Sequence, residues 1–314
     1  MLIGHQKQWD FLKKAAENKR FSHAYLFAGR EKLGKKTLAL QWLSFLLGDD
    51  NGSGGFRIEK HPDVIFIEPK QTDSAKAFTG KEEIQIVQIR DLIRKLSLKS
   101  SGAPFKAAVI DNAHLMNREA QSSLLKTLEE PRGETLLILI SDKTQYLFPT
   151  ILSRVQTVRF NSVAKEEIEN YLSKQGVSKK ETEEISGLAS GRPGVALDLI
   201  SDKRKLADFN QRIAELDKIS NSALCFRFEY VKKLADDLKS IKDVLDTWLA
   251  YFRDVLLARF SSSKSSCRPT NENFERYPAA KIKNIIENIQ TTKFLLASTN
   301  ANSKLALETL MLEF

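Results

Sequence analysis

Residues 29–37 read Gly-Arg-Glu-Lys-Leu-Gly-Lys-Lys-Thr, and they lie between an apolar run and an amphipathic one. Glycines in such a loop let backbone N–H groups surround phosphate oxygens, and a lysine adds a positive charge beside them. Residues 23–28 have the composition of a buried strand, and the apolar residues from Leu38 to Leu46 recur at helical spacing. The stretch therefore predicts a strand, a phosphate-binding loop and a helix N-terminus, with Gly29, Gly34 and Lys35 as the nucleotide-binding residues. A glycine turn that merely joins a strand to a helix is the plain alternative.

The loop departs from the usual pattern one residue after its lysine, where a Ser or Thr hydroxyl normally binds Mg²⁺. Lys36 holds that position, and Thr37, one residue on, points about 100° away around a helix. A second apolar run, residues 105–110, precedes Asp111, as in P-loop enzymes that hold Mg²⁺ with such an acid. Asn112 follows where many such ATPases have Glu, and an amide cannot accept a proton as a carboxylate can. ATP or ADP is therefore expected to bind with little or no hydrolysis. The expected nucleotide-binding residues also include Lys36, Thr37 and Asp111, and Asp111 is the candidate Mg²⁺ ligand.

Length and composition bound the remaining possibilities. A chain of 314 residues is expected to form two or three domains. Its formal charge of +9 is compatible with contact with a polyanion such as DNA, but it is also typical of basic proteins that make no such contact. No apolar run is long enough to span a membrane and the first residues lack a signal-peptide pattern, so a cytoplasmic protein is expected. Cys225 and Cys267 cannot form a zinc or disulfide framework, and the four histidines are scattered.

Strand and helix patterns alternate up to about residue 160 and then give way to helices alone. This alternation predicts an α/β domain with a parallel sheet, followed by all-α domains. The expected domains are a nucleotide-binding domain over residues 1–160, a helical lid over 161–203 and a helical domain over 204–314. The expected strands are residues 24–28, 64–67, 107–110, 136–140 and 155–160.

Two helices of the first domain can be outlined in advance. Asn117 is expected to cap a helix that ends before Pro131, because a residue that precedes proline is pushed out of the helical region. Residues 83–99 form an amphipathic pattern whose polar side includes Arg90 and Arg94. Those arginines belong either to a solvated face or to a surface that meets phosphates.

The ordered motifs resemble one known family. The chain is similar to the bacterial clamp-loader AAA+ family of DNA polymerase III, and to its delta-prime members in particular. The motifs that carry this resemblance are the phosphate-binding loop, Asp111, the Leu-Leu-Lys-Thr-Leu-Glu-Glu-Pro run at 124–131 and the Pro-Thr-Ile-Leu-Ser-Arg run at 149–154. The resemblance implies an AAA+ P-loop module with a five-stranded parallel sheet, a helical lid and a C-terminal collar. It also implies gamma/tau-like ATPase subunits, the delta subunit, the sliding clamp and primer-template DNA as partners in loading the clamp.

The same resemblance assigns further residues and leaves alternatives open. Ser153-Arg154-Val155 keeps the arginine of the family's Ser-Arg-Cys signature, which implies that Arg154 is an arginine finger acting in trans on a neighbour's ATP. Ser141 or Asp142 takes the sensor position, and Gly194 stands where hydrolysing members carry arginine. The family's four-cysteine zinc module is missing from residues 48–55, so no zinc is expected. The alternatives are an ATP-hydrolysing motor subunit or helicase loader, and a DNA-binding protein with a vestigial nucleotide site.

Overall fold

The computed structural model describes residues 2–18, 20–48, 58, 61–71, 82–131, 133–235, 238–260, 277–298 and 301–314. These residues form two compact units, an N-terminal unit of Met1–Tyr171 with Gly191–Gly194 and a C-terminal unit of Leu172–Ser190 with Val195–Phe314. The domain boundaries expected at residues 160 and 203 stay predictions. The sequence also predicts irregular loops at 49–55 and 70–81; apart from residues 70 and 71, which form a short strand, these loops lie outside the described residues, as do the Ser-rich stretch at 261–266 and Cys267.

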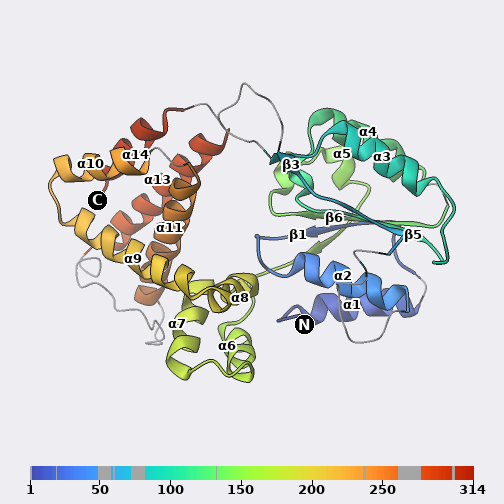
Figure 1. The fold of residues 1–314 in the computed structure, drawn as a ribbon, viewed down its shortest axis with the longest axis horizontal. Coiled ribbons are helices and arrows are strands. Elements are labelled where there is room, and N and C mark those ends of the chain that lie inside the picture. The colour runs from blue at the N-terminus through green and yellow to red at the C-terminus, as the bar shows by residue number, and fades with distance from the viewer. Residues whose placement is uncertain are drawn as a thin grey trace. The chain divides into compact units, whose positions relative to one another are not determined.

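The N-terminal unit is built on a β-sheet, several of whose strands are labelled in Figure 1. This sheet has five strands in the order β2-β5-β6-β1-β7, and all neighbouring strands run parallel. Its strands are β1 (Ala24–Ala28), β2 (Val64–Ile67), β5 (Lys106–Ile110), β6 (Thr135–Ser141) and β7 (Gln156–Arg159). A separate antiparallel pair joins β3 (Lys70–Gln71) to β4 (Glu82–Glu83). The predicted five-stranded parallel sheet is confirmed.

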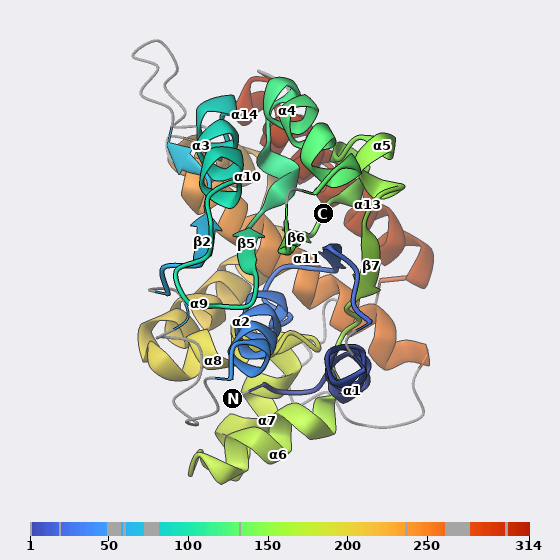
Figure 2. The ribbon, with the colours of Figure 1, turned by 90° about the vertical axis from the view of Figure 1, so that its right-hand side faces the viewer.

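Helices cover both faces of this sheet, as Figure 2 shows for α2 and α1 on one side and α3 and α4 on the other. The helices and 3₁₀ turns of this part of the chain are α1 (Gln6–Glu17), α2 (Lys35–Leu46), α3 (Ile86–Leu96), η2 (Ala113–Leu115), α4 (Arg118–Glu129), η3 (Thr144–Tyr146) and α5 (Pro149–Leu152). Tyr25 and Phe27 of β1 pack with Trp42 of α2, whereas Leu26 packs with Leu124 of α4. Alternate residues of a strand point to opposite faces, so one buried strand supplies both cores.

Local signals set the ends of these helices. The Asn117 side chain accepts a hydrogen bond of 2.8 Å from the N–H of Ala120 and caps α4, as the sequence predicts. Helix α4 ends at Glu129, two residues before Pro131. Helix α3 is shorter than the expected range of 83–99, because residues 84 and 116 pair as an isolated parallel bridge before it begins.

Beyond β7 the described chain forms helices. They are α6 (Lys165–Lys174), α7 (Lys179–Ala189), α8 (Pro193–Ser201), α9 (Lys203–Ser220), α10 (Leu224–Leu234), α11 (Leu238–Phe260), α13 (Ala279–Ser298) and α14 (Ser303–Met311). The core of the C-terminal unit surrounds Trp248 of α11, whose ring lies against Tyr230 and Phe314. Arg227 of α10 donates to the backbone carbonyls of Ser220, Ser222 and Met311, so one side chain ties three segments together. No helix in the described part of the chain is long and apolar enough to cross a membrane.

Candidate functional site: the phosphate-binding loop

The glycine loop follows β1 at the carboxyl edge of the parallel sheet and leads into α2. Gly34 precedes α2 with φ of 91°, in the left-handed region that a residue without a Cβ adopts at little cost. The N–H of Gly29 donates to the carbonyl of Ser141 at the end of β6, a bond of 3.1 Å. Carboxyl edges of parallel sheets are the usual place for ligands, and here the first turn of α2 begins at Lys35.

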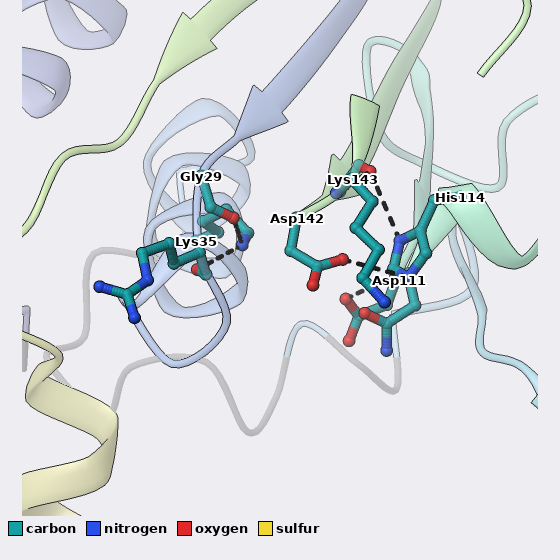
Figure 3. A network of polar contacts seen from close by, with 9 residues as sticks. Gly29, Lys35, Asp111, His114, Asp142 and Lys143 are labelled. Atoms are coloured by element: carbon teal, nitrogen blue, oxygen red, sulfur yellow. Dashed lines mark hydrogen bonds and ion pairs between the residues drawn. The ribbon is translucent and has the colours of Figure 1, made fainter. Parts of the chain in front are cut away.

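The side chain of Lys35 turns back into its own loop. Only 6% of the residue is exposed, and its Nζ donates to the carbonyl of Gly29 and, at 2.7 Å, to that of Arg30 (Figure 3). Burial lowers the pKa of Lys35, while the negative charges of Asp142 and Asp111 act in the opposite direction. A phosphate would therefore have to compete with two loop carbonyls for this cation.

The Lys36 side chain extends toward a carboxylate at the same edge of the sheet. Its Nζ lies 2.6 Å from Oε1 of Glu68, the residue that follows β2. Asp111 follows the neighbouring strand β5, and its carboxyl accepts a 2.9 Å bond from the N–H of Asn112. Burial raises the pKa of Asp111, and Glu68 acts in the same direction, whereas Lys36 and Lys35 lower it. Thr37 is exposed on α2, as expected from its helical position.

A second polar group lies beside the loop, at the ends of β6 and η2. Nε2 of His114 is 3.1 Å from Oδ1 of Asp142, and its Nδ1 is 3.4 Å from Oγ of Ser141 (Figure 3). Burial lowers the pKa of His114, against the raising effect of Asp142. The sequence left the sensor position open between Ser141 and Asp142, and both contact this histidine. The role of the pair stays a prediction.

Gly194, the second residue of α8, packs directly on the loop. The N–H of Gly194 donates to the carbonyl of Lys32 over 2.9 Å. A Cβ at Gly194 would lie 2.9 Å from that carbonyl oxygen and 3.0 Å from the Cβ of Lys32, closer than ordinary contact. Any larger residue here, including the arginine expected of hydrolysing relatives, requires the loop or the start of α8 to move.

We expect Gly194→Ala to lower the free energy of unfolding by about 1–3 kcal/mol, because it overpacks a contact between two backbone segments. Gly187→Ala is the matched control, since Gly187 lies inside α7 and a Cβ there meets nothing within 4 Å. That change should instead raise stability by about 0.5–1 kcal/mol through helix propensity. Urea unfolding of the full chain measures both. Equal stability of the Gly194 variant and the parent chain would contradict the close contact.

A cavity of about 640 Å³ opens beside the loop within the N-terminal unit. Gly29, Arg30 and Asp142 line it, together with Arg159 and Asn161 at the end of β7. Sites for small ligands commonly fall between about 300 and 1,000 Å³. The cavity therefore has room for a nucleotide-sized ligand beside Arg30 and Arg159, whereas Lys35, Lys36 and Asp111 do not line it.

Arg154 lies away from the loop, directly after the short helix α5 and before the edge strand β7. Its guanidinium donates to the carbonyl of Thr150 at 3.0 Å, to Oγ of Ser153 at 3.2 Å and to Oε1 of Glu129 at 2.6 Å. The side chain remains 34% exposed, so a partner could reach it once Glu129 is displaced. Sequence reasoning did not find Glu129 as its partner.

Comparison with known proteins identifies the family. The family profile described as DNA polymerase III, delta subunit, matches residues 4–164. The DNA polymerase III subunit delta' of Bacillus subtilis is 30% identical over 258 residues, which cover 77% of this chain and 69% of that protein. The chain belongs to the DNA polymerase III delta-prime family.

Further similarities are also to DNA polymerase III subunits. The delta' subunit of Pseudomonas aeruginosa is 33% identical across 48% of this chain and 45% of that protein. The tau subunit of Bacillus subtilis is 26% identical across 82% of this chain and 49% of that protein, so the chain spans about half of both. A crystal structure of a DNA polymerase III gamma subunit-related protein from Thermotoga maritima has the same fold, with a TM-score of 0.50, 19% identity and 97% coverage of each chain. The chain thus has the predicted AAA+ fold and belongs with the clamp-loader-like subunits of DNA polymerase III.

The structure gathers most of the predicted site residues at one sheet edge. Gly29, Gly34, Lys35 and Lys36 lie there with Asp111, and Asp142 joins them from β6. Two residues that sequence reasoning missed, Glu68 and His114, belong to the same edge. The described residues contain no group of three metal-ligating side chains, and residues 49–55, on which the zinc expectation depends, are not described. Binding roles therefore remain proposals.

Proposed function

We propose that this chain is the delta-prime subunit of a clamp loader, which helps to place a sliding clamp on primed DNA and supplies Arg154 to a neighbouring subunit's ATP. Arg154 carries this proposal: its guanidinium is partly exposed and is held by the exposed carboxylate of Glu129. An ion pair of this kind contributes about 0–1 kcal/mol, so a triphosphate in another subunit can displace Glu129. Guanidinium groups suit that task because their planar fork of donors binds phosphate oxygens.

The chain's own loop is proposed to bind nucleotide weakly and without hydrolysis. Lys35 is engaged by two carbonyls of the loop, which opposes tight binding. Asn112 stands beside Asp111 with an amide that cannot serve as a general base. Gly194 has no side chain with which to reach a phosphate, and its neighbours leave no room for one. Turnover by the isolated chain is accordingly expected to be absent.

The partners follow from the family as proposals. Gamma/tau-like ATPase subunits and the delta subunit would assemble with this chain, and the complex would hold the sliding clamp and primer-template DNA. DNA contact is expected to run along phosphates, with a salt dependence and without base specificity. Arg94 bonds to Asp91 of its own helix at 2.8 Å, so its engagement with DNA stays a hypothesis.

Co-expression with gamma/tau-like and delta subunits tests the assignment. We expect the full chain to co-purify with them as one complex at physiological salt. A chain that stays monomeric in their presence would count against the proposal. Steady ATP turnover by the isolated chain near 1 s⁻¹ with Mg²⁺ would instead favour the alternative that this chain is an ATP-hydrolysing motor subunit. Lys35 and Asp111 are the residues that support this alternative.

A further inference from the structure

Lys36 lies where a metal-binding hydroxyl stands in other phosphate-binding loops. In those loops the Ser or Thr after the lysine and an Asp at the end of a neighbouring strand together hold the Mg²⁺ that bridges nucleotide phosphates. Here Asp111 is at the expected strand end, but an ammonium group replaces the hydroxyl. Its Nζ lies 2.6 Å from Glu68, and its charge acts on Asp111. The cation is thus paired with the acid that follows β2, and its charge lowers the pKa of the acid that follows β5.

These residues do not fit a magnesium ion. Mg²⁺ requires oxygen ligands in near-octahedral order, and it is repelled by a positive charge in its own coordination shell. An ammonium group has three donors and no lone pair, so Lys36 cannot serve as a ligand. The other carboxylate at this edge, that of Glu68, is already paired with Lys36 through Oε1.

We propose that the Lys36 ammonium replaces the divalent cation, so that this loop binds the phosphates of ATP or ADP without a metal ion. The inference rests on the proposed nucleotide binding and extends it. Lys35 and Lys36 are consecutive cations at the N-terminus of α2, where backbone N–H groups also favour an anion. Glu68 is 58% exposed on its side chain, so a phosphate can displace it from Lys36 at little cost. The built-in cation also explains weak binding, because two lysines supply less charge than one lysine and Mg²⁺.

Calorimetric titration of the full chain with ATP is the direct test, performed once with excess MgCl₂ and once with EDTA. The expected dissociation constants agree within about 3-fold. Binding that requires Mg²⁺, with a difference of about 10-fold or more, would overturn the inference and leave nucleotide binding intact. No heat at millimolar ATP in either buffer would overturn both the inference and nucleotide binding by this chain. The proposed role of Arg154 would survive that result, because Arg154 acts on a neighbour's nucleotide.

Variants at Lys36 and at Lys283 distinguish a specific role of the Lys36 ammonium group from a general effect of positive surface charge. Lys36→Met should weaken ATP binding about 10- to 100-fold in both buffers, as expected for a lost charge-assisted hydrogen bond. Lys36→Thr restores the hydroxyl and should make binding about 10-fold or more tighter with Mg²⁺ than with EDTA. Lys283→Met removes another lysine that pairs with a glutamate, Glu287 at 3.7 Å in α13, and should leave affinity unchanged. Wild-type affinity in Lys36→Met would contradict the proposal.

The Glu68→Gln variant tests the proposal while leaving Lys36 in place. The change takes away the carboxylate that competes with phosphate for the ammonium, so ATP should bind about 2- to 5-fold more tightly in EDTA. Circular dichroism and thermal unfolding establish that each variant is folded before titration. Weaker binding by a folded Glu68→Gln chain would show that Glu68, rather than Lys36, organises the site, and the inference would fall.

Discussion

Replacing Arg154 with alanine is expected to lower ATP turnover by the assembled clamp loader about 10-fold or more while leaving this chain folded. The fold should survive because the Arg154 side chain is 34% exposed and its carboxylate partner, Glu129, is 49% exposed, and such pairs contribute about 0–1 kcal/mol. Turnover should fall because a guanidinium in trans stabilises negative charge that grows only in the transition state. The loss should therefore appear in kcat of the partner site more than in its affinity for ATP.

The measurement is steady-state ATP hydrolysis by the reconstituted complex with DNA and clamp present. Arg118→Ala is the matched control, since Arg118 is an exposed arginine at the start of α4 with no assigned role. Lys35→Ala should reduce complex turnover less than Arg154→Ala does, because the chain's own loop is proposed to be silent in hydrolysis. If Lys35→Ala instead abolished ATP turnover by the complex and Arg154→Ala left it unchanged, this chain would be an ATP-hydrolysing motor subunit.

The fold could be predicted from the sequence because its signals are local. Apolar runs of four or five residues, such as 24–28 and 107–110, match β1 and β5 closely, since strands buried on both faces read as continuous apolar segments. Asn117 and Pro131 bracket α4 for reasons that operate within a single turn. The order of strands is not local. Strand β2 pairs with β5 rather than with β1, and the run of elements along the chain does not specify this.

Strand order explains which site residues sequence reasoning found and which it missed. Asp111 could be found because phosphate-binding loops pair with an acid at a strand end. Glu68 could have been found by the same rule once β2 and β5 were known as neighbours, because carboxyl ends of parallel strands meet at one edge. His114 gave no such signal, since its approach to Asp142 depends on the turn η2. The contact between Gly194 and Lys32 joins segments far apart in sequence.

The loop's first glycine should prove the most sensitive position for stability. Gly29 has φ of +156°, and a Cβ there would lie 2.5 Å from the backbone oxygen and 2.9 Å from the Cβ of Phe160. Gly29→Ala therefore combines backbone strain of about 1–3 kcal/mol with overpacking of about 1–3 kcal/mol. Phe160 cannot move aside freely, because its N–H bonds to the carbonyl of Ala28 at 2.7 Å and its ring packs on Phe27.

Gly102→Ala separates the two contributions. Gly102 has nearly the same φ, +153°, but a Cβ there meets nothing within 4 Å, so only the backbone strain remains. In urea unfolding, the free energy of unfolding of Gly102→Ala should be about 1–3 kcal/mol lower than that of the parent chain. The value for Gly29→Ala should be lower by about a further 1–3 kcal/mol. Equal losses would mean that the backbone at Phe160 yields to the new methyl group.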